Sequence, residues 1–171
     1  MLLHASIAIA RTSAVFTAVA KTSDSLDSLE QALGHSPAAA RHYLRLDWDQ
    51  PSEFLSALSS HVERVGPPSF VLAWLHDMTL GPPLARAVSG KGTGCEFFQV
   101  LGSGAASPGN GAAALREEMQ QQGRIAYHQV VLGFVQEAGG SRWLNDDEIS
   151  AGVLQATALR RPVHTVGTTA G

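Results

Sequence analysis

The chain has 171 residues, 44% of them hydrophobic and 16% charged, with a net charge of −3, which suits one domain over residues 1–171 with a flexible tail at 161–171. The slight acidity gives no electrostatic footprint for nucleic acid, and no apolar run is long enough to span a membrane. A single cysteine, Cys95, excludes an internal disulfide and fits a reducing compartment, so we expect a cytoplasmic protein.

Strand-like segments alternate with helix-like segments along the chain, which is the pattern of a parallel sheet with helical crossovers. Runs of strand formers, helix caps and stop signals define these segments. Residues 2–10 are small and apolar and suit either a helix or a strand. The expected strands cover residues 14–20, 43–47, 69–77, 95–101, 125–135 and 162–166, and the expected helices cover residues 26–33, 52–65, 82–88, 112–122 and 146–159.

Two of the helices carry clear sequence signals. Ser52 is expected to cap the helix over residues 52–65, whose apolar stripe consists of Leu55, Leu58, Val62 and Val65. Asn145, with Glu148 three places on, is a variant of the capping box and predicts the start of the last helix.

Residues 69–77 read Ser-Phe-Val-Leu-Ala-Trp-Leu-His-Asp, and the rest of the chain is organised around them. The run is nearly all apolar, too short for a free-standing helix and without alternation, so it predicts a strand buried on both faces. In open parallel sheets, ligands bind beyond the carboxyl ends of the strands. His76 and Asp77 lie at that end and either meet a ligand or simply reach solvent.

The order of elements and the residues at the strand ends resemble the short-chain dehydrogenase/reductase family, in its atypical branch. The local matches are Leu46-Asp47-Trp48-Asp49 before a helix, Phe70-Val71-Leu72-Ala73-Trp74-Leu75-His76, Phe98-Gln99-Val100-Leu101-Gly102-Ser103, and the segment from Tyr127 to Val135. The resemblance implies an α/β fold, a Rossmann-like three-layer sandwich with a mainly parallel sheet. It also implies an NAD(P)-dependent oxidoreductase that acts on a small molecule.

Two features of the family have no counterpart in this sequence. The first strand and its glycine-rich loop, which binds pyrophosphate through backbone N–H groups, are absent, and Met1 aligns just after them. The catalytic Tyr-x-x-x-Lys is also absent, because Tyr127 is followed four places on by Val131 and no lysine lies beyond Lys91. Without a nearby cation a tyrosine keeps a high pKa, so the proton donor is unknown and the protein could be inactive.

In the family's strand order the absent strand lies in the middle of the sheet. Its absence leaves residues 14–20 and 70–76 with unpaired edges, at a cost of about 1–3 kcal/mol for each buried backbone group. Three arrangements avoid this cost. The two strands close up, residues 3–9 become a strand, or the sequence is a truncated form of a longer protein, which is the interpretation we favour.

The resemblance implies that the cofactor contacts Lys21, Asp47, Trp48, Leu75, His76 and Ser103. A cation at Lys21 favours a 2′-phosphate and therefore NADP over NAD, although Lys21 is equally well read as a solvated lysine at a strand end. Asp47 could accept a hydrogen bond from the adenine amino group or could cap a turn, and Asp49 competes for both roles. Because the glycine-rich loop is missing, we expect weak or absent NADPH binding by this chain.

Other candidate residues have plainer interpretations. Ser103 is the one weak catalytic candidate, but Gly102-Ser103-Gly104 does not match Gly-x-Ser-x-Gly, so a plain turn is favoured. Tyr127 and His128 fall within a strand and are expected to pack or pair rather than react. Arg142-Trp143 is either a substrate-side or oligomer surface, or Trp143 packs under the last helix, which we favour.

The function expected first is an NADP-dependent oxidoreductase, or a descendant of one. The alternatives are a non-catalytic nucleotide-binding or protein-interaction domain on a Rossmann fold, and a hydrolase that uses Ser103. The histidine spacing and the single cysteine predict no metal site. The resemblance implies a homodimer, and we expect neither nucleic acid nor a membrane as a partner.

Overall fold

The computed structural model describes residues 1–34, 40–89, 94–106, 111–122 and 124–169, except for the side chains of residues 105 and 106. The α-helices are α1 (Leu3–Thr12), α2 (Ser23–Leu33), α3 (Pro51–Val65), α4 (Gly81–Val88), α5 (Ala112–Gln120) and α6 (Asp146–Leu159). The strands are β1 (Val15–Ala20), β2 (Ala40–Arg45), β3 (Phe70–Trp74), β4 (Cys95–Leu101), β5 (Ile125–Leu132), β6 (Phe134–Glu137), β7 (Gly140–Trp143) and β8 (Val163–Val166). Two short 3₁₀ helices, η1 (Met78–Leu80) and η2 (Ser103–Ala106), follow β3 and β4.

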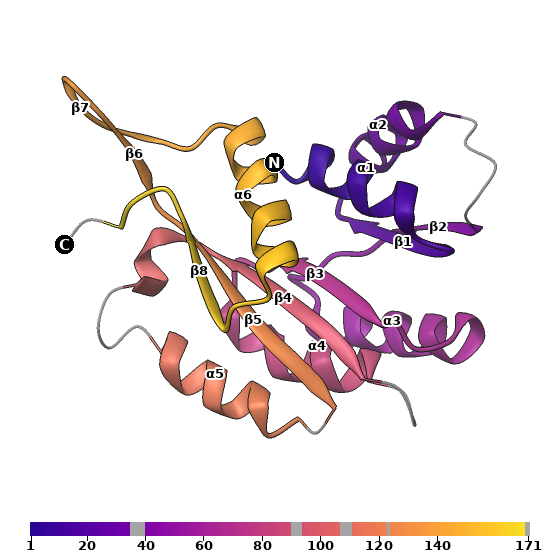
Figure 1. The fold of residues 1–171 in the computed structure, drawn as a ribbon. Helices are drawn as coiled ribbons and strands as arrows, with labels where there is room; N and C mark the ends of the chain where they lie inside the picture. Colours follow the sequence, from indigo (N-terminus) through magenta and orange to yellow (C-terminus); the bar gives the residue numbers. More distant parts are fainter. Residues whose placement is uncertain (35–39, 90–93, 107–110, 123, 170–171) are drawn as a thin grey trace.

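A four-stranded parallel sheet in the order β3-β4-β5-β8 forms the centre of the molecule (Figure 1). Helices α4 and α5 cover one face and α6 covers the other, so the predicted three-layer α/β arrangement is confirmed. No helix in the described part of the chain is long and apolar enough to cross a membrane.

Strands β1 and β2 form a second, separate parallel sheet. Residues 3–12 are helical, so of the two structures left open for residues 2–10 the helix is the one that forms, and the alternative of a strand over residues 3–9 is wrong. The alternative in which the strands close up is also wrong, because within the described residues β1 pairs only with β2 and β3 pairs only with β4. The sheet is therefore divided where the family's first strand was expected.

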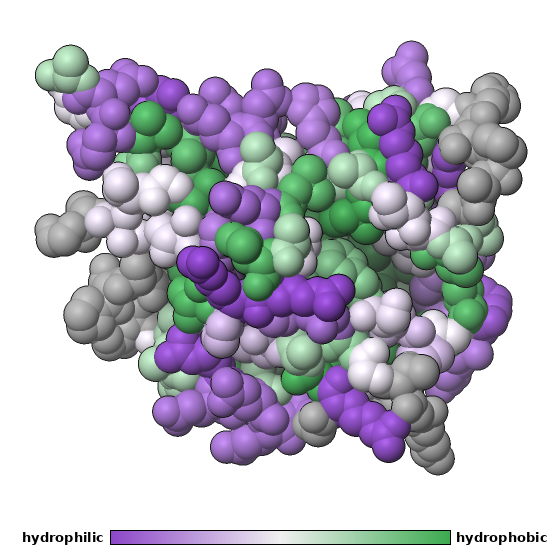
Figure 2. Space-filling view, in the orientation of Figure 1, coloured by the Kyte–Doolittle hydropathy of each residue, from purple (hydrophilic) through white to green (hydrophobic). Residues whose placement is uncertain are grey.

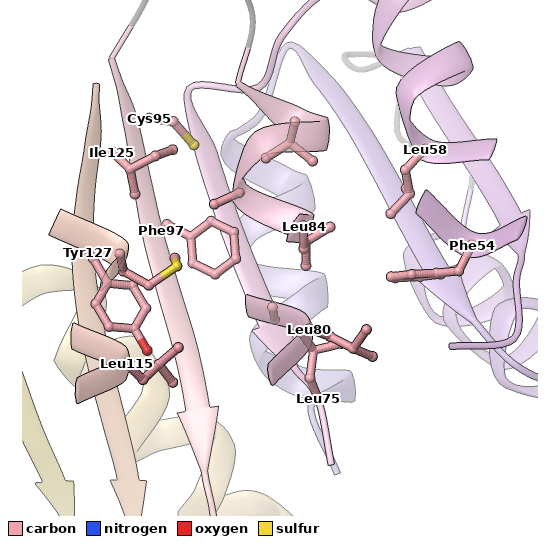
Figure 3. Packing of buried hydrophobic residues seen from close by; sticks show 14 residues of the cluster. Phe54, Leu58, Leu75, Leu80, Leu84, Cys95, Phe97, Leu115, Ile125 and Tyr127 are labelled. Atoms are coloured by element: carbon pink, nitrogen blue, oxygen red, sulfur yellow. The ribbon is translucent and has the colours of Figure 1, made fainter. Parts of the chain in front are cut away.

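The core consists of three clusters, one on each face of the central sheet and one under α2. The largest lies between α3, α4, α5 and the sheet and includes Phe54, Leu84 and Phe97 (Figure 3). On the opposite face Val100 and Val130 pack against Val153 of α6. These fully buried strand residues explain why β4 and β5 could be predicted from their apolar runs.

The helix caps form much as predicted. Thr22 Oγ1 accepts from the N–H of Ser25 at the start of α2, and Gly34, with φ of 55°, ends that helix. At α6 the side chain of Asn145 accepts from the N–H of Glu148 at 2.9 Å, and the Glu148 carboxylate accepts from the N–H of Asn145 at 2.9 Å. This reciprocal pair confirms the predicted capping box.

The start and the buried side of α3 differ from the prediction. The helix begins at Pro51, because proline is favoured in the first turn where no N–H is needed, and Ser52 lies inside it. Its buried residues are Phe54, Leu58 and His61, so only Leu58 of the expected stripe is fully buried. The apolar periodicity predicted where the helix lies in the sequence but identified only one residue of its buried face correctly.

Strand β3 is shorter and less buried than predicted. It covers five residues, and of these only Ala73 is buried, whereas its other apolar residues are half-exposed. The expectation of a strand buried on both faces is therefore corrected. The physical reason is that no strand among the described residues pairs with one of its edges.

At the end of the chain the strand predicted over residues 162–166 forms as β8, whereas the flexible tail predicted over residues 161–171 does not begin at 161. Val163–Val166 pair with β5, and the N–H and C=O of Thr168 both bond to Phe134 at 2.8 Å, so residues 163–168 are held by the sheet rather than forming part of a tail from 161. Residues 170–171 of that tail lie outside the described residues. The hairpin of β6 and β7 was not predicted at all, because its sequence is polar and glycine-rich.

Candidate functional site

The strands of both sheets end at the same edge of the molecule. Helix α3 carries the chain back from the end of β2 to the start of β3, so β2 and β3 point in the same direction, as in a right-handed crossover. Lys21 follows β1, residues 47–49 follow β2, residues 75–76 follow β3, and Ser103 follows β4. In sheets of this kind the carboxyl edge is where ligands bind.

Lys21, Asp47 and Asp49 form a compact charged cluster beyond β1 and β2. The Nζ atom of Lys21 lies 2.9 Å from Asp47 Oδ1 and 2.5 Å from Asp49 Oδ2. It also lies 5.4 Å from the centre of the Trp48 ring, within the range of a cation–π contact. The structure thus brings together three of the six residues predicted to bind a cofactor.

The charges in this cluster stabilise one another. The hydrogen bonds that Lys21 donates to Asp49 and Asp47 raise the pKa of Lys21. The Lys21 ammonium, followed by the N–H of Asp49, lowers the pKa of Asp47. Asp47 Oδ1 accepts that N–H at 2.9 Å, so Asp47 closes a turn, as one of its two interpretations predicted, and it also pairs with Lys21.

The cluster carries one positive and two negative charges, so its net charge is negative. Its carboxylate oxygens can accept hydrogen bonds from ribose hydroxyls or from an adenine amino group, and the Trp48 ring can contact a flat base. A 2′-phosphate can use Lys21 only by competing with the two carboxylates for the ammonium group. The donors and acceptors present therefore fit an adenosine group.

The end of β3 presents fewer side chains to the candidate site than expected. The Leu75 side chain is buried in the core, so only its main chain is available at the edge. His76 is exposed, and its ring centre lies 6.5 Å from that of Trp74. Asp77 begins η1, where its carboxylate accepts from the N–H of Thr79 at 2.9 Å; the hydrogen bonds from Thr79 lower the pKa of Asp77.

Ser103 is half-buried at the first position of η2, directly after β4. A 3₁₀ helix follows it rather than the α-helix of a nucleophile elbow. Within the described residues no hydrogen bond joins Ser103 to a histidine or carboxylate, and none joins His76 or Ser103 to the Lys21 cluster. Ser103 therefore has no visible activating base.

Tyr127 and His128 pack and pair within β5, as expected. The Tyr127 hydroxyl donates to Gln99 Oε1 at 2.9 Å, and burial raises the pKa of Tyr127 to about 12. His128 stacks on Phe98, with ring centres 4.3 Å apart, and its Nε2 lies 2.8 Å from Glu96 Oε2. Neither side chain is placed for proton transfer at the carboxyl edge.

The prediction for Trp143 was wrong. Its side chain is 63% exposed on the projecting β6–β7 hairpin, and its ring packs against Phe134 with centres 4.4 Å apart rather than lying under α6. The neighbouring Arg142 pairs with Glu137 at 2.6 Å and with Glu148 at 2.8 Å. Arg142, together with the N–H of Asn145, lowers the pKa of Glu148 to about 2.

Two other kinds of site were considered. In the described part of the chain no three histidine, cysteine, aspartate or glutamate side chains lie close enough together to hold a metal ion. A shallow depression of about 340 Å³ is lined by His4, Ile7, Ala8 and Arg11. It lies on the outer side of α1, opposite the buried Ala5 and Ala10, and not among the strand ends.

Comparison with known proteins supports the fold. No protein-family model matches the sequence, and no curated protein matches it. Similar solved structures include an alcohol dehydrogenase from the archaeon Thermococcus sibiricus, complexed with 5-hydroxy-NADP, at 20% identity and a TM-score of 0.68, covering 96% of this chain and 89% of that chain. A short-chain dehydrogenase from Sphingobium yanoikuyae in complex with NADPH matches at 16% identity and a TM-score of 0.69. The match covers 95% of this chain and 82% of that chain.

A third similar structure is the bulky-bulky ketone specific alcohol dehydrogenase from Comamonas testosteroni, at 14% identity and a TM-score of 0.68, covering 98% of this chain and 82% of that chain. The similar structures therefore confirm the fold that the sequence resemblance implied. At these identities the likeness establishes the fold and assigns no residue a role.

Proposed function

We propose that this chain, which has the fold of short-chain dehydrogenases, binds a nicotinamide dinucleotide and is an NADP-dependent oxidoreductase for a small alcohol or carbonyl compound. The observation that carries the proposal is the cluster of Lys21, Asp47 and Trp48 at the carboxyl ends of two parallel strands. Two of the similar structures are complexes with 5-hydroxy-NADP and with NADPH, which supports the choice of cofactor.

In this proposal the cluster would hold the adenosine end of the dinucleotide. Asp47 would accept hydrogen bonds from the adenosine group, Trp48 would contact the base, and Lys21 would hold the 2′-phosphate that distinguishes NADP. Hydride chemistry would be supplied by the bound nicotinamide. His76 and Ser103, at the ends of β3 and β4, are the polar side chains on the side of the cluster where a substrate would lie.

Binding is expected to be weak. Helix α1 begins at Leu3 with no side-chain cap and with no glycine-rich loop before it in this sequence, so few backbone N–H groups are arranged for a pyrophosphate. Isothermal titration calorimetry with NADPH and NADH tests the proposal directly. Weak binding of NADPH that Lys21→Ala abolishes supports it, whereas no binding of either nucleotide at millimolar concentration contradicts it.

A matched control for Lys21→Ala is Arg11→Ala, which removes one positive charge from the outer side of α1. It should leave NADPH binding unchanged. A dissociation constant in the low micromolar range for the unmodified chain would show that the missing loop is not needed.

A non-catalytic nucleotide-binding domain is the second candidate. It is favoured by Tyr127, whose hydroxyl is buried and hydrogen-bonded to Gln99 and so offers no proton donor at the strand ends. Turnover separates the two candidates. Oxidation of NADPH in the presence of ketones supports the oxidoreductase, and nucleotide binding without turnover supports the second candidate.

A cytoplasmic location agrees with the buried, unpaired Cys95.

A further inference from the structure

His128 is a buried histidine that the proposed function does not use. It lies near the start of β5, on the same face of the central sheet as Val130, which packs against Val153 of α6. Its ring stacks on that of Phe98 in β4, with ring centres 4.3 Å apart. The polar neighbours of a ring buried in this way decide which protonation state it adopts.

Both ring nitrogens of His128 meet hydrogen-bond acceptors. Nδ1 lies 2.9 Å from the carbonyl oxygen of Arg161, and Nε2 lies 2.8 Å from Glu96 Oε2. A carbonyl oxygen and an ionised carboxylate accept hydrogen bonds and cannot donate them. A neutral histidine carries one N–H, so it satisfies one of these partners and turns a lone pair towards the other. The two contacts therefore form together only when the ring is doubly protonated or when Glu96 is protonated instead.

The surroundings favour a proton on the ring rather than on Glu96. In ordinary peptides an imidazole holds its proton to a pH about two units higher than a carboxylate does. The side chain of Glu96 is 31% exposed, and water stabilises its ionised form. The carbonyl of Arg161 lies just beyond the end of α6, where the helix dipole favours a positive charge.

The other charged groups around the ring do not oppose this assignment. His164 of β8 shares the face of His128, because it is the register partner of Val130. Burial, followed by the charge of Arg161, lowers the pKa of His164, so His164 is neutral at pH 7.5. Helix α6 has no charged residue between Glu148 and Arg160. Arg160 and Arg161 are exposed, and Figure 2 shows strongly hydrophilic surface, in purple, where α6 meets β8, so water screens their charges.

The connection that His128 contacts is short and strained. Arg160 ends α6 with a φ of 50°, and it is the one non-glycine residue with positive φ in the described part of the chain. This conformation is unfavourable for a residue with a Cβ atom and persists where surrounding contacts hold it. Two residues on, Pro162 O accepts from the N–H of Gln129 at 2.9 Å, which begins the pairing of β8 with β5. The His128–Arg161 hydrogen bond lies between these two features.

We propose that doubly protonated His128 is a pH-sensitive switch, which holds the α6–β8 connection against the central sheet and releases it when the ring loses a proton at alkaline pH. After that loss the ring presents a lone pair to Glu96 Oε2 or to Arg161 O, and one of the two contacts becomes repulsive. The N–H of Gln129 then parts from Pro162 O, and β8 separates at its beginning. β8 is able to do so because it is an edge strand of the central sheet.

Long-range ¹⁵N–¹H correlation spectra of the ring nitrogens test the protonation state without any nucleotide, so failure here is distinct from failure of the proposed function. The signals of His128 are assigned by their absence in His128→Gln. At pH 7.5 both nitrogens of His128 should carry hydrogens, whereas the exposed His76 should be largely neutral. An unprotonated nitrogen on His128 at this pH would overturn the proposal.

Glu96→Gln is the matched variant. Its side-chain amide can donate to Nε2, so a neutral ring satisfies both neighbours. Nε2 of His128 should therefore carry no hydrogen at pH 7.5 in this variant. A ring that stays doubly protonated in Glu96→Gln would show that the carboxylate does not hold the proton, which contradicts the switch.

Amide hydrogen exchange tests the release of β8. It is measured one pH unit below and one pH unit above the pH at which the spectra show His128 losing its proton. The reporter is the amide of Gln129, and the control is the amide of Gly133, which bonds to Val166 O at 2.9 Å at the other end of the β5–β8 ladder. The ratio of the two exchange rates removes the common effect of pH on intrinsic exchange.

The Gln129-to-Gly133 ratio should rise at least about fivefold across this step in the unmodified chain and by less than about twofold in Glu96→Gln and in His128→Gln. An unchanged ratio in the unmodified chain would show that β8 is not released. An equal rise in the variants would show that the release does not depend on this pair. A ring that keeps both hydrogens until the whole chain unfolds would mean a fixed ion pair and no switch.

Discussion

His61 of α3 and Thr17 of β1 are joined by a hydrogen bond of 2.9 Å between Nε2 and Oγ1. His61 is buried, and its Nδ1 accepts from the Arg64 guanidinium at 3.0 Å, so Nε2 carries the hydrogen and donates it to Thr17. This polar contact attaches α3 to the smaller sheet.

Thr17→Val is expected to lower the free energy of unfolding by about 1 kcal/mol, because the shape is kept but a buried N–H loses its acceptor. Urea denaturation at neutral pH measures the change. Thr12→Val is the control, since Thr12 bonds only within the exposed end of α1 and should have a much smaller effect. Equal losses in both variants would show that the His61 contact contributes little.

The stability of the protein should fall on mild acidification, and His61 should account for part of the fall. Burial, followed by the charges of His42 and Arg64, lowers the pKa of His61 below its value in the unfolded chain, about 6.5. The unfolded chain then binds the proton more readily, so the stabilising contribution of neutral His61 is present above pH 6.5 and is lost as pH falls through the folded pKa.

Urea denaturation of the unmodified chain and of His61→Gln at pH 7.5 and pH 5.5 isolates this effect, because the two proteins differ only at this side chain. The unmodified chain should lose more stability than the variant over this interval. Identical losses in the two proteins would contradict the assignment.

Asp49→Asn should favour NADPH. The substitution removes one carboxylate from Lys21 and leaves the ammonium freer to meet a 2′-phosphate, so the affinity for NADPH should rise roughly fivefold. Calorimetric titration with NADPH and NADH measures the ratio of the two dissociation constants. Asp24→Asn, in the first turn of α2, makes the same change in net charge and should leave that ratio unaltered. An equal gain for NADH would argue against a 2′-phosphate at Lys21.

Gly152→Ala should be destabilising, although alanine normally favours a helix by about 1 kcal/mol. A methyl group on Gly152 would overlap the side chain of Val166 in β8, and such overpacking costs about 1–3 kcal/mol. The measurement is thermal unfolding of Gly152→Ala alone and combined with Val166→Ala, which should relieve the overlap. Gly139→Ala is the control because its side chain would meet no atom within 4 Å. A stabilised Gly152→Ala protein would mean that β8 does not pack closely on α6.

The sequence predicted most of the elements because their signals are local. Short apolar runs rich in strand formers, such as residues 95–101, favour strands of a covered sheet, and the Asn145–Glu148 pair marks a helix start by itself. The hairpin of β6 and β7 was missed because its stability comes from one aromatic contact, Phe134 with Trp143, and from ion pairs made by Arg142. No short-range sequence pattern predicts contacts of that kind.

The candidate site was predicted in part for the same reason. Residues at strand ends can be placed from the strands alone, so Lys21 and Asp47 were both predicted at the ends of strands. Their mutual ion pair, and the share that Asp49 takes in it, depend on side-chain directions that periodicity does not give. The division of the sheet depends on which strands find neighbours, and that is decided across the whole fold.

The divided sheet has a consequence for how the molecule comes apart. Within the described residues, no ladder bond connects the portion built from β1, β2 and α2 to the remaining strands, so side-chain packing through α1 and α3 is what holds that portion in place. Segments held only by side-chain packing unfold locally at a lower free energy than segments hydrogen-bonded into a continuous sheet. The amino-terminal third should therefore unfold as a separate, earlier step, while the four strands of the central sheet remain paired.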